Sequence, residues 1–221
     1  MPKFFVNSNQ IENEKITISG NDVNHIKNVL RKKINDEITI CNASTSKDYL
    51  CQIIEINESN IICSIKEKIN TEVESNIKVT IFQGLPKADK MELVIQKSVE
   101  LGVFDITPVE MKRCVVKLNE KEKIKKIQRW QKISEVAAKQ CGRSMIPQIN
   151  NIISLQNICN LHDKYDIVLV AYENEKEVTI KQELKKIKEK YNNKEIRIAV
   201  IIGPEGGITP EEVTLLQEQR S

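Results

Sequence analysis

Continuous apolar segments that alternate with amphipathic helices dominate the chain after residue 76. Asp166–Tyr172 and Ile196–Ile202 are apolar along nearly their whole length, as strands are when helices cover both faces of a parallel sheet. Two further strands are expected at 77–82 and 104–109. This alternation predicts an α/β domain with a mainly parallel sheet and helices on both faces.

Four helices are expected between and after these strands. They are Asp89–Leu101, Asn119–Cys141, Val178–Lys190 and a segment that begins at Thr209. Asp89 is the expected N-cap of the first helix. The last helix has a capping threonine, Pro210 at its first position and Glu212 at its third. Trp130 falls on the apolar face of the longest helix, so we expect it in the core.

The first 72 residues have a different pattern, with short β-rich runs separated by Asn, Asp, Ser and Gly. The runs are Lys15–Ser19, Glu37–Cys41, Tyr49–Ile56 and Asn60–Lys66, and one helix, about Asp22 to Arg31, interrupts them. This predicts a small barrel-like β domain over residues 1–72, followed by the α/β domain over residues 73–221.

Basic residues gather in one window of a nearly neutral chain. Residues 111–143 contain eleven Lys or Arg against three Asp or Glu, although the whole chain carries only +3. Such a segment indicates binding to the phosphate backbone of a nucleic acid, and a solvated lysine-rich helix face is the alternative. Aromatic residues make up only 4%, which argues against single-strand binding by base stacking.

The cysteines and histidines indicate no metal site. The six cysteines are scattered without a Cys-x-x-Cys pair, and the two histidines, His25 and His162, are far apart. We expect reduced, mostly buried thiols and a structural His25. No apolar run has the length of a membrane span, and the N-terminus lacks a signal-peptide core, so a cytoplasmic location is expected.

The loop Gly203–Gly207 follows a buried strand, and ligands of parallel sheets bind at such carboxyl ends. Its glycines permit a tight backbone and close approach of a ligand. It has neither the phosphate-loop nor the dinucleotide spacing, and Glu205 would repel a phosphate. A neutral or cationic ligand such as S-adenosylmethionine suits the loop, whereas a purely structural strand-to-helix turn is the alternative.

Ile201–Gly207 also resembles the cofactor loop of the SPOUT-class (trefoil-knot) methyltransferases. Further segments resemble the ribosomal RNA small-subunit methyltransferase E family: 83–92, 96–102, Arg113–Lys117, Gln140–Arg143, and His25–Arg31 in a PUA-like N-terminal domain. The resemblance implies S-adenosylmethionine-dependent methylation of N3 of a uridine in 16S ribosomal RNA of the small subunit. It also implies a homodimer, with an apolar face near Ile208, Val213 and Leu216.

Site residues follow from the same resemblance. The implied cofactor-binding residues are Ala171, Tyr172, Glu173, Ile202, Gly203, Pro204, Glu205, Gly206 and Gly207. Arg113 and Arg143 are the implied catalytic residues, since an arginine would stabilise the developing uridine anion. Arg31, Lys87 and Lys90 are the implied RNA-binding residues. The proton acceptor stays open, because neither histidine is placed for that role.

The family pattern continues with a Leu-Gly-x-x-Ile/Val-Leu-Arg-x-Glu-Thr segment and a final helix, whereas this sequence ends at Ser221. We therefore expect an incomplete knot, a cofactor pocket that lacks one wall, and weak cofactor binding. Two other functions are considered. A nucleotide- or NAD-dependent enzyme is disfavoured, because the turn Gln83–Lys87 lacks the fingerprint glycines. A non-catalytic RNA-binding module is the other alternative.

Overall fold

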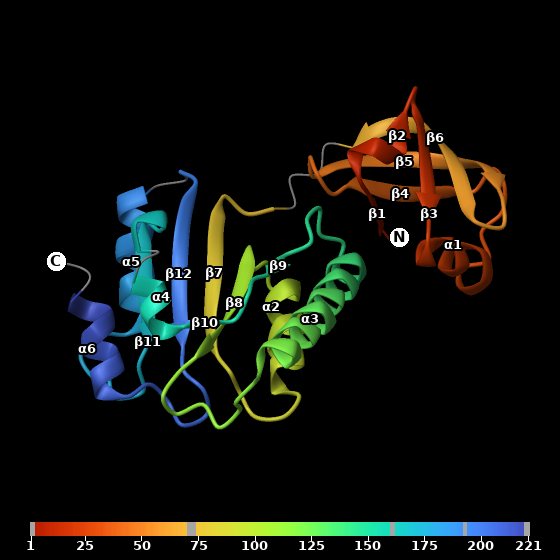
Figure 1. The fold of residues 1–221 in the computed structure, drawn as a ribbon. Helices are drawn as coiled ribbons and strands as arrows, with labels where there is room; N and C mark the ends of the chain where they lie inside the picture. The colour runs from red at the N-terminus through yellow and green to blue at the C-terminus, as the bar shows by residue number, and fades with distance from the viewer. Residues whose placement is uncertain (1–2, 70–73, 160–161, 192–193, 219–221) are drawn as a thin grey trace. The chain divides into compact units, whose positions relative to one another are not determined.

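The computed structural model describes residues 3–69, 74–159, 162–191 and 194–218 (Figure 1). The chain divides into two compact units. The first unit comprises Met1–Glu74 together with Val136–Ile146, and the second comprises Ser75–Glu135 together with Pro147–Ser221. Residues 136–146, at the end of the longest helix, therefore group with the N-terminal unit.

A curled six-stranded sheet forms the first unit, in the order β1-β4-β5-β6-β3-β2. Its strands are β1 (Lys3–Val6), β2 (Ile11–Glu12), β3 (Lys15–Ser19), β4 (Glu37–Asn42), β5 (Lys47–Ile56) and β6 (Asn60–Ile69). Neighbouring strands are antiparallel, apart from the parallel pair β1 and β4. The four strands that the sequence predicts here are confirmed, and β1 and β2 add to them.

The core of this sheet follows the two-residue period of its strands. On β5, Tyr49, Cys51 and Ile53 are buried, since alternate side chains point to the same face. They pack with other inward residues, chiefly Phe4, Val6, Ile16, Ile18, Ile38, Ile40, Ile61 and Cys63. The thiols at positions 51 and 63 are thus core residues, and burial raises the pKa of each to about 12.

The helix predicted at Asp22–Arg31 forms as two short pieces. A single α-turn, α1 (Asn21–Asn24), continues as a π-helical turn, η2 (His25–Val29), in which the Leu30 amide donates to the His25 carbonyl at 2.9 Å. Arg31 then adopts the left-handed conformation, with φ of 53°, and ends the segment. A 3-10 turn, η1 (Ser8–Gln10), lies between β1 and β2.

Ser144 ties residues 136–146 into the first unit. The buried Lys3 ammonium lies 2.7 Å from the Asp48 carboxylate and 3.1 Å from the Ser144 hydroxyl, and that hydroxyl donates to Asp48 at 3.0 Å. Buried charges are tolerated when they are paired and hydrogen-bonded. This network therefore joins three segments that are distant in sequence, and no local sequence pattern predicts it.

The sheet of the second unit is parallel throughout, in the order β10-β8-β7-β12-β11 with β9 on β8. Its strands are β7 (Ile77–Gly84), β8 (Asp105–Glu110), β9 (Gln148–Ile149), β10 (Ile153–Ser154), β11 (Ile167–Ala171) and β12 (Ile196–Ile202). The parallel α/β prediction is confirmed. β12 lies between β7 and β11 in the interior of the sheet, which explains why its residues other than Arg197 are apolar.

Among the residues that the structure describes, five helices and a 3-10 turn accompany these strands. They are α2 (Lys90–Glu100), α3 (Glu120–Cys141), α4 (Leu155–Cys159), η3 (His162–Lys164), α5 (Ile180–Tyr191) and α6 (Pro210–Glu218). Trp130 of α3 is buried, as predicted. Asp89 is the N-cap residue of α2, as predicted, although its side chain makes no capping hydrogen bond. The knot implied by the family resemblance stays a prediction.

Candidate functional site

Four loops meet at one edge of the parallel sheet, because parallel strands all end on the same side. They follow β7, β8, β11 and β12, and they carry most of the site residues that the sequence predicts. Ile202 ends β12, Ala171 ends β11, and Tyr172 follows it. Residues more than 100 positions apart are thus placed at one edge of the sheet.

The glycine loop after β12 is folded too tightly for side chains. The Gly207 amide donates to the Pro204 carbonyl at 2.8 Å, and Gly207 has a φ of 75°. A Cβ atom on Gly203 would lie 2.9 Å from both Gly207 and Ile208. A Cβ atom on Gly84, at the end of β7, would lie 2.7 Å from Pro204. Glycine is therefore required by close packing at several points of this loop.

Glu205 holds this loop against the start of α2. Its carboxylate accepts the Lys87 amide at 3.0 Å and lies 2.9 Å from the Lys90 ammonium. The hydrogen bond from Lys90 is the main reason that the pKa of Glu205 falls to about 2. Lys87 and Lys90 are both exposed, and both contact Glu205 of the glycine loop. Their role in binding RNA stays a prediction.

Arg113 and Glu173 lie over the two adjacent glycines of the same loop. The Arg113 guanidinium donates from Nη1 to the Gly206 carbonyl at 2.7 Å, and this nitrogen lies 3.6 Å from Glu173 Oε1. Added Cβ atoms would come within 3.1 Å of the Arg113 side chain at Gly206 and within 1.9 Å of the Glu173 carboxylate at Gly207. The structure thus brings the predicted catalytic residue Arg113 and the predicted cofactor-binding residue Glu173 together at the glycine loop.

The other two predicted basic residues, Arg143 and Arg31, belong to the first unit. Arg143 is buried, and its guanidinium pairs with Glu74, whose carboxylate also accepts the Ser144 amide at 2.9 Å. Arg31 is exposed. The catalytic role of Arg143 stays a prediction, and the structure gives this residue a stabilising contact that the sequence does not indicate.

Gln83 is a site residue that sequence reasoning missed. Its side-chain amide donates to the Gly203 carbonyl at 3.2 Å and to the Gly84 carbonyl at 2.9 Å, and it is buried. It therefore links the end of β7 to the glycine loop. The available signal was its position directly after the strand predicted at 77–82, at the ligand-binding edge of the sheet.

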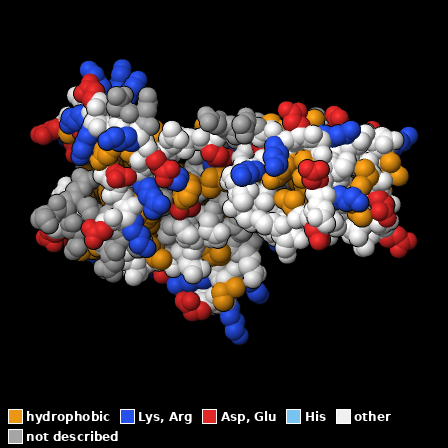
Figure 2. All heavy atoms as spheres, turned by 90° about the horizontal axis from the view of Figure 1, so that it is seen from above, with side chains coloured by type: hydrophobic (Ala, Val, Ile, Leu, Met, Phe, Trp, Pro, Cys, Tyr) orange, Lys and Arg blue, Asp and Glu red, His pale blue; other side chains and the backbone are white. Residues whose placement is uncertain are grey.

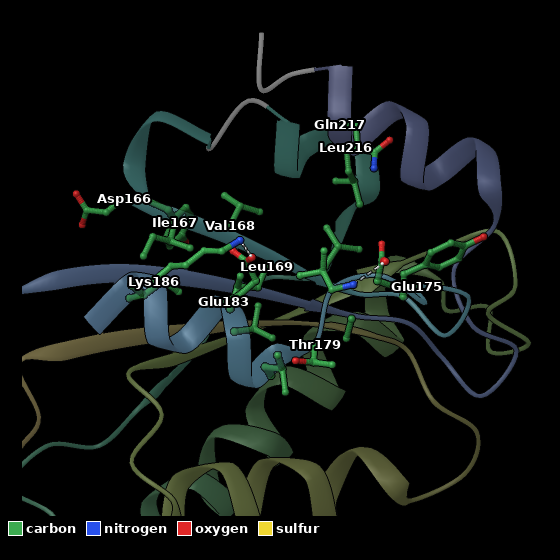
Figure 3. Close-up of a pocket in the computed structure, with 18 of the residues that line it drawn as sticks. Asp166, Ile167, Val168, Leu169, Glu175, Thr179, Glu183, Lys186, Leu216 and Gln217 are labelled. Carbon is green, nitrogen blue, oxygen red and sulfur yellow. Dashed lines mark hydrogen bonds and ion pairs between the residues drawn. The ribbon is translucent and has the colours of Figure 1, made fainter. Parts of the chain in front are cut away.

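An apolar groove of about 830 Å³ runs along β11, the edge strand of the sheet. β11 residues such as Val168 and Val170 line it together with residues of α5 and α6. In Figure 3, Leu216 of α6 and Lys186 of α5 lie on opposite sides of it. Ala171 and Tyr172 also line the groove, so it reaches the predicted cofactor-binding segment.

The residues of this edge fit S-adenosylmethionine better than a phosphate-containing cofactor. The glycine loop follows a strand of a parallel sheet and is rich in glycine, which suits a ligand held by main-chain hydrogen bonds. The loop also lacks the glycine spacing of phosphate-binding and dinucleotide-binding loops. Within the described ranges, no group of His, Cys, Asp and Glu side chains is placed to hold a metal ion. No described helix has the length and apolarity to cross a membrane.

Comparison with known families gives matches in both halves of the chain. A family model described as an RNA methyltransferase domain matches residues 73–221. A second one, described as an RNA methyltransferase PUA domain, matches residues 18–66. The two matches lie on either side of the boundary that the sequence predicts at residue 72.

Individual relatives agree with the family models. Ribosomal RNA small subunit methyltransferase E of Bacillus subtilis is 35% identical over 99% of this chain and 86% of the relative. The protein of the same name from Rickettsia conorii is 30% identical over 99% of this chain and 84% of the relative. A structure of the Neisseria gonorrhoeae protein of that name, bound to S-adenosylmethionine, has a TM-score of 0.77 and 27% identity, and the match covers 100% of this chain and 86% of that one.

Proposed function

The chain belongs to the RNA methyltransferase family that includes ribosomal RNA small subunit methyltransferase E, and we propose that it methylates small-subunit ribosomal RNA with S-adenosylmethionine. The observation that carries this proposal is the cluster of Arg113 and Glu173 on the glycine loop, in a chain whose fold matches a cofactor-bound relative. The site lies where parallel sheets bind their ligands.

When bound, S-adenosylmethionine supplies an electrophilic methyl group on a positively charged sulfur. Glycines 203, 206 and 207 allow the tight loop against which Arg113 and Glu173 pack, and the Glu173 carboxylate offers charge complementarity to the sulfonium. Glu205 and Gln83 keep the loop closed from the side of β7. The protein thereby fixes the direction of attack, which is the main source of rate in a methyl transfer between two aligned partners.

The finer proposal is that the acceptor is N3 of a uridine in 16S ribosomal RNA. N3 must lose its proton before it attacks, and the negative charge then spreads to the base oxygens. Nη1 of Arg113 donates to Gly206, and the side chain is 44% exposed. The guanidinium carries further N–H donors, which would stabilise this anion.

Calorimetry tests the cofactor first. The chain should bind S-adenosylmethionine, even if weakly, in preference to NAD, which separates this function from the nucleotide-dependent alternative. Small subunits from a strain lacking the protein should then gain one methyl group on incubation with enzyme and cofactor. Mass mapping of that RNA locates the methyl group. Binding of RNA without any methyl transfer would instead favour the non-catalytic RNA-binding module.

A row of lysines on α3 supports RNA as the partner. Lys121, Lys125 and Lys132 are exposed and lie on one face of the helix, at spacings of four and seven residues. Basic and acidic side chains are interspersed over the face shown in Figure 2, so the overall charge does not mark an RNA surface. The row of lysines on α3 is a better candidate for the RNA-binding surface, because aligned cations can follow a phosphate backbone.

Replacing these three lysines by glutamine is expected to weaken RNA binding and flatten its dependence on salt. Each lost phosphate contact lowers the slope of log affinity against log salt by about 0.7 to 0.9, so the slope of the triple variant should fall by about 2 to 3. Affinity measured from low to moderate salt gives this slope. The matched control replaces Lys181, Lys185 and Lys188 of α5, where acidic residues are interleaved. Equal loss in both variants would contradict a specific RNA surface on α3.

We further propose a cytoplasmic homodimer. Two of the three residues expected on an apolar dimer face, Ile208 and Leu216, are buried within the chain. The groove along β11 offers apolar surface instead, including Ile180, which is 68% exposed. Stable homodimers bury large apolar interfaces. Light scattering should therefore give about twice the 25.4 kDa of one chain, and a single-chain mass over a wide concentration range would contradict the proposal.

A further inference from the structure

Glu212 is buried at the start of α6, and its carboxylate uses both oxygens on the main chain. Oε2 accepts the Thr209 amide at 2.9 Å, and the Glu212 amide donates to the Thr209 hydroxyl at 3.3 Å. This is the reciprocal capping box that the sequence predicts. Oε1 accepts the Lys112 amide at 2.7 Å, from a segment 100 positions earlier in the chain.

The second contact goes beyond what a helix cap requires. A capping glutamate needs only one acceptor for the N-cap amide, so the bond to Lys112 serves the loop that follows β8. That loop carries Arg113 as its next residue, and the Arg113 guanidinium donates to the Gly206 carbonyl at 2.7 Å. Glu212 therefore ties the backbone beside Arg113 to the helix that follows the glycine loop.

We propose that Glu212 is a positioning residue that fixes Arg113 over the glycine loop for methyl transfer. This inference rests on the proposed function. The shortest contacts of the Arg113 segment with the glycine loop and α6 are the bond from the Lys112 main-chain amide to Glu212 and the side-chain bond from Arg113 to Gly206, each 2.7 Å long. A side chain held at only one end samples more positions, and misplacement by about 1 Å lowers catalytic rates steeply.

Glu212→Gln separates this role from simple helix capping. The side-chain oxygen of glutamine can accept a hydrogen bond from one of the two main-chain amides, that of Thr209 or that of Lys112. Its NH2 group then faces the other amide, which is also a donor. The matched control is Glu211→Gln, which removes the same charge from the same helical turn. The Glu211 carboxylate is exposed and lies 3.5 Å from the Lys112 ammonium, so this control leaves the Lys112 amide bond intact.

In the wild-type background, we expect Glu212→Gln to lower kcat about 10- to 100-fold, with little change in affinity for S-adenosylmethionine. Glu211→Gln should change kcat less than about twofold, as a surface charge does. Amide hydrogen exchange reports the contact independently of activity. The Lys112 amide should exchange faster in Glu212→Gln and at the wild-type rate in Glu211→Gln.

The decisive measurement repeats Glu212→Gln in an Arg113→Ala background. If Glu212 acts through Arg113, the losses of kcat in the two single variants are not additive. Glu212→Gln then lowers kcat hardly further in the Arg113→Ala background. The same fold-loss in both backgrounds overturns the inference, and so does unchanged exchange at Lys112. A wild-type chain that neither binds S-adenosylmethionine nor methylates small subunits overturns the proposed function instead, and faster exchange at Lys112 would then show only a structural contact.

Discussion

Gly207→Ala is expected to lower methyl transfer about 100-fold while the chain stays folded, because small displacements at a reacting centre have effects of that size. Gly207 has a φ of 75°, a conformation that costs a residue with a Cβ about 1 to 2 kcal/mol. The new Cβ would also lie 1.9 Å from Glu173 Oε1. The carboxylate must therefore move, and its contact with Arg113 is lost with it.

The control for Gly207→Ala is Gly102→Ala. Gly102 follows α2 and has a φ of 98°, but a Cβ there would meet no atom within 4 Å. Both variants carry left-handed backbone strain, and only the first disturbs the site. Thermal unfolding should show a comparable loss of stability in the two variants, whereas turnover on small subunits should fall only in Gly207→Ala. An equal loss of turnover would mean that general destabilisation explains the effect.

Arg113→Ala should lower kcat about 100- to 1000-fold, the usual effect of removing a donor that stabilises an oxyanion. Stability should change little, because the pair of Arg113 and Glu173 is about half exposed and such pairs contribute about 1 kcal/mol or less. Arg113→Lys should recover part of the rate. Lysine keeps the charge but lacks the planar fork of donors that can reach Gly206 and the substrate together.

Kinetics on small subunits distinguish catalysis by Arg113 from RNA binding. Lys117→Ala is the control, because Lys117 is an exposed cation on the same segment, and its kcat should stay within about twofold of wild type. Loss of kcat in Arg113→Ala at saturating RNA supports a role in the chemical step. A higher KM for RNA with an unchanged kcat would instead make Arg113 a phosphate contact, and the proposed anion stabilisation would be wrong.

Much of the α/β unit could be predicted because its signals are local. The apolar run Ile196–Ile202 specifies a buried strand, since a parallel strand in the middle of a sheet meets neighbours on both faces. Thr209 and Glu212 specify the start of α6, because the capping box involves residues three apart. The glycine loop was also recognisable from its composition and its place after a strand, and the resemblance to a family rested on such short segments.

What the sequence by itself determined was therefore the element types, the ligand-binding edge of the sheet and the family. Only the tertiary structure decided which side chains meet there. It pairs Arg113 with Gly206 and Glu173, gives Glu212 a second partner at Lys112, and pairs Arg143 with Glu74. These partners lie about 60 to 100 positions apart. Backbone preference and periodicity act over a few residues, whereas such contacts arise only when packed strands bring their ends together.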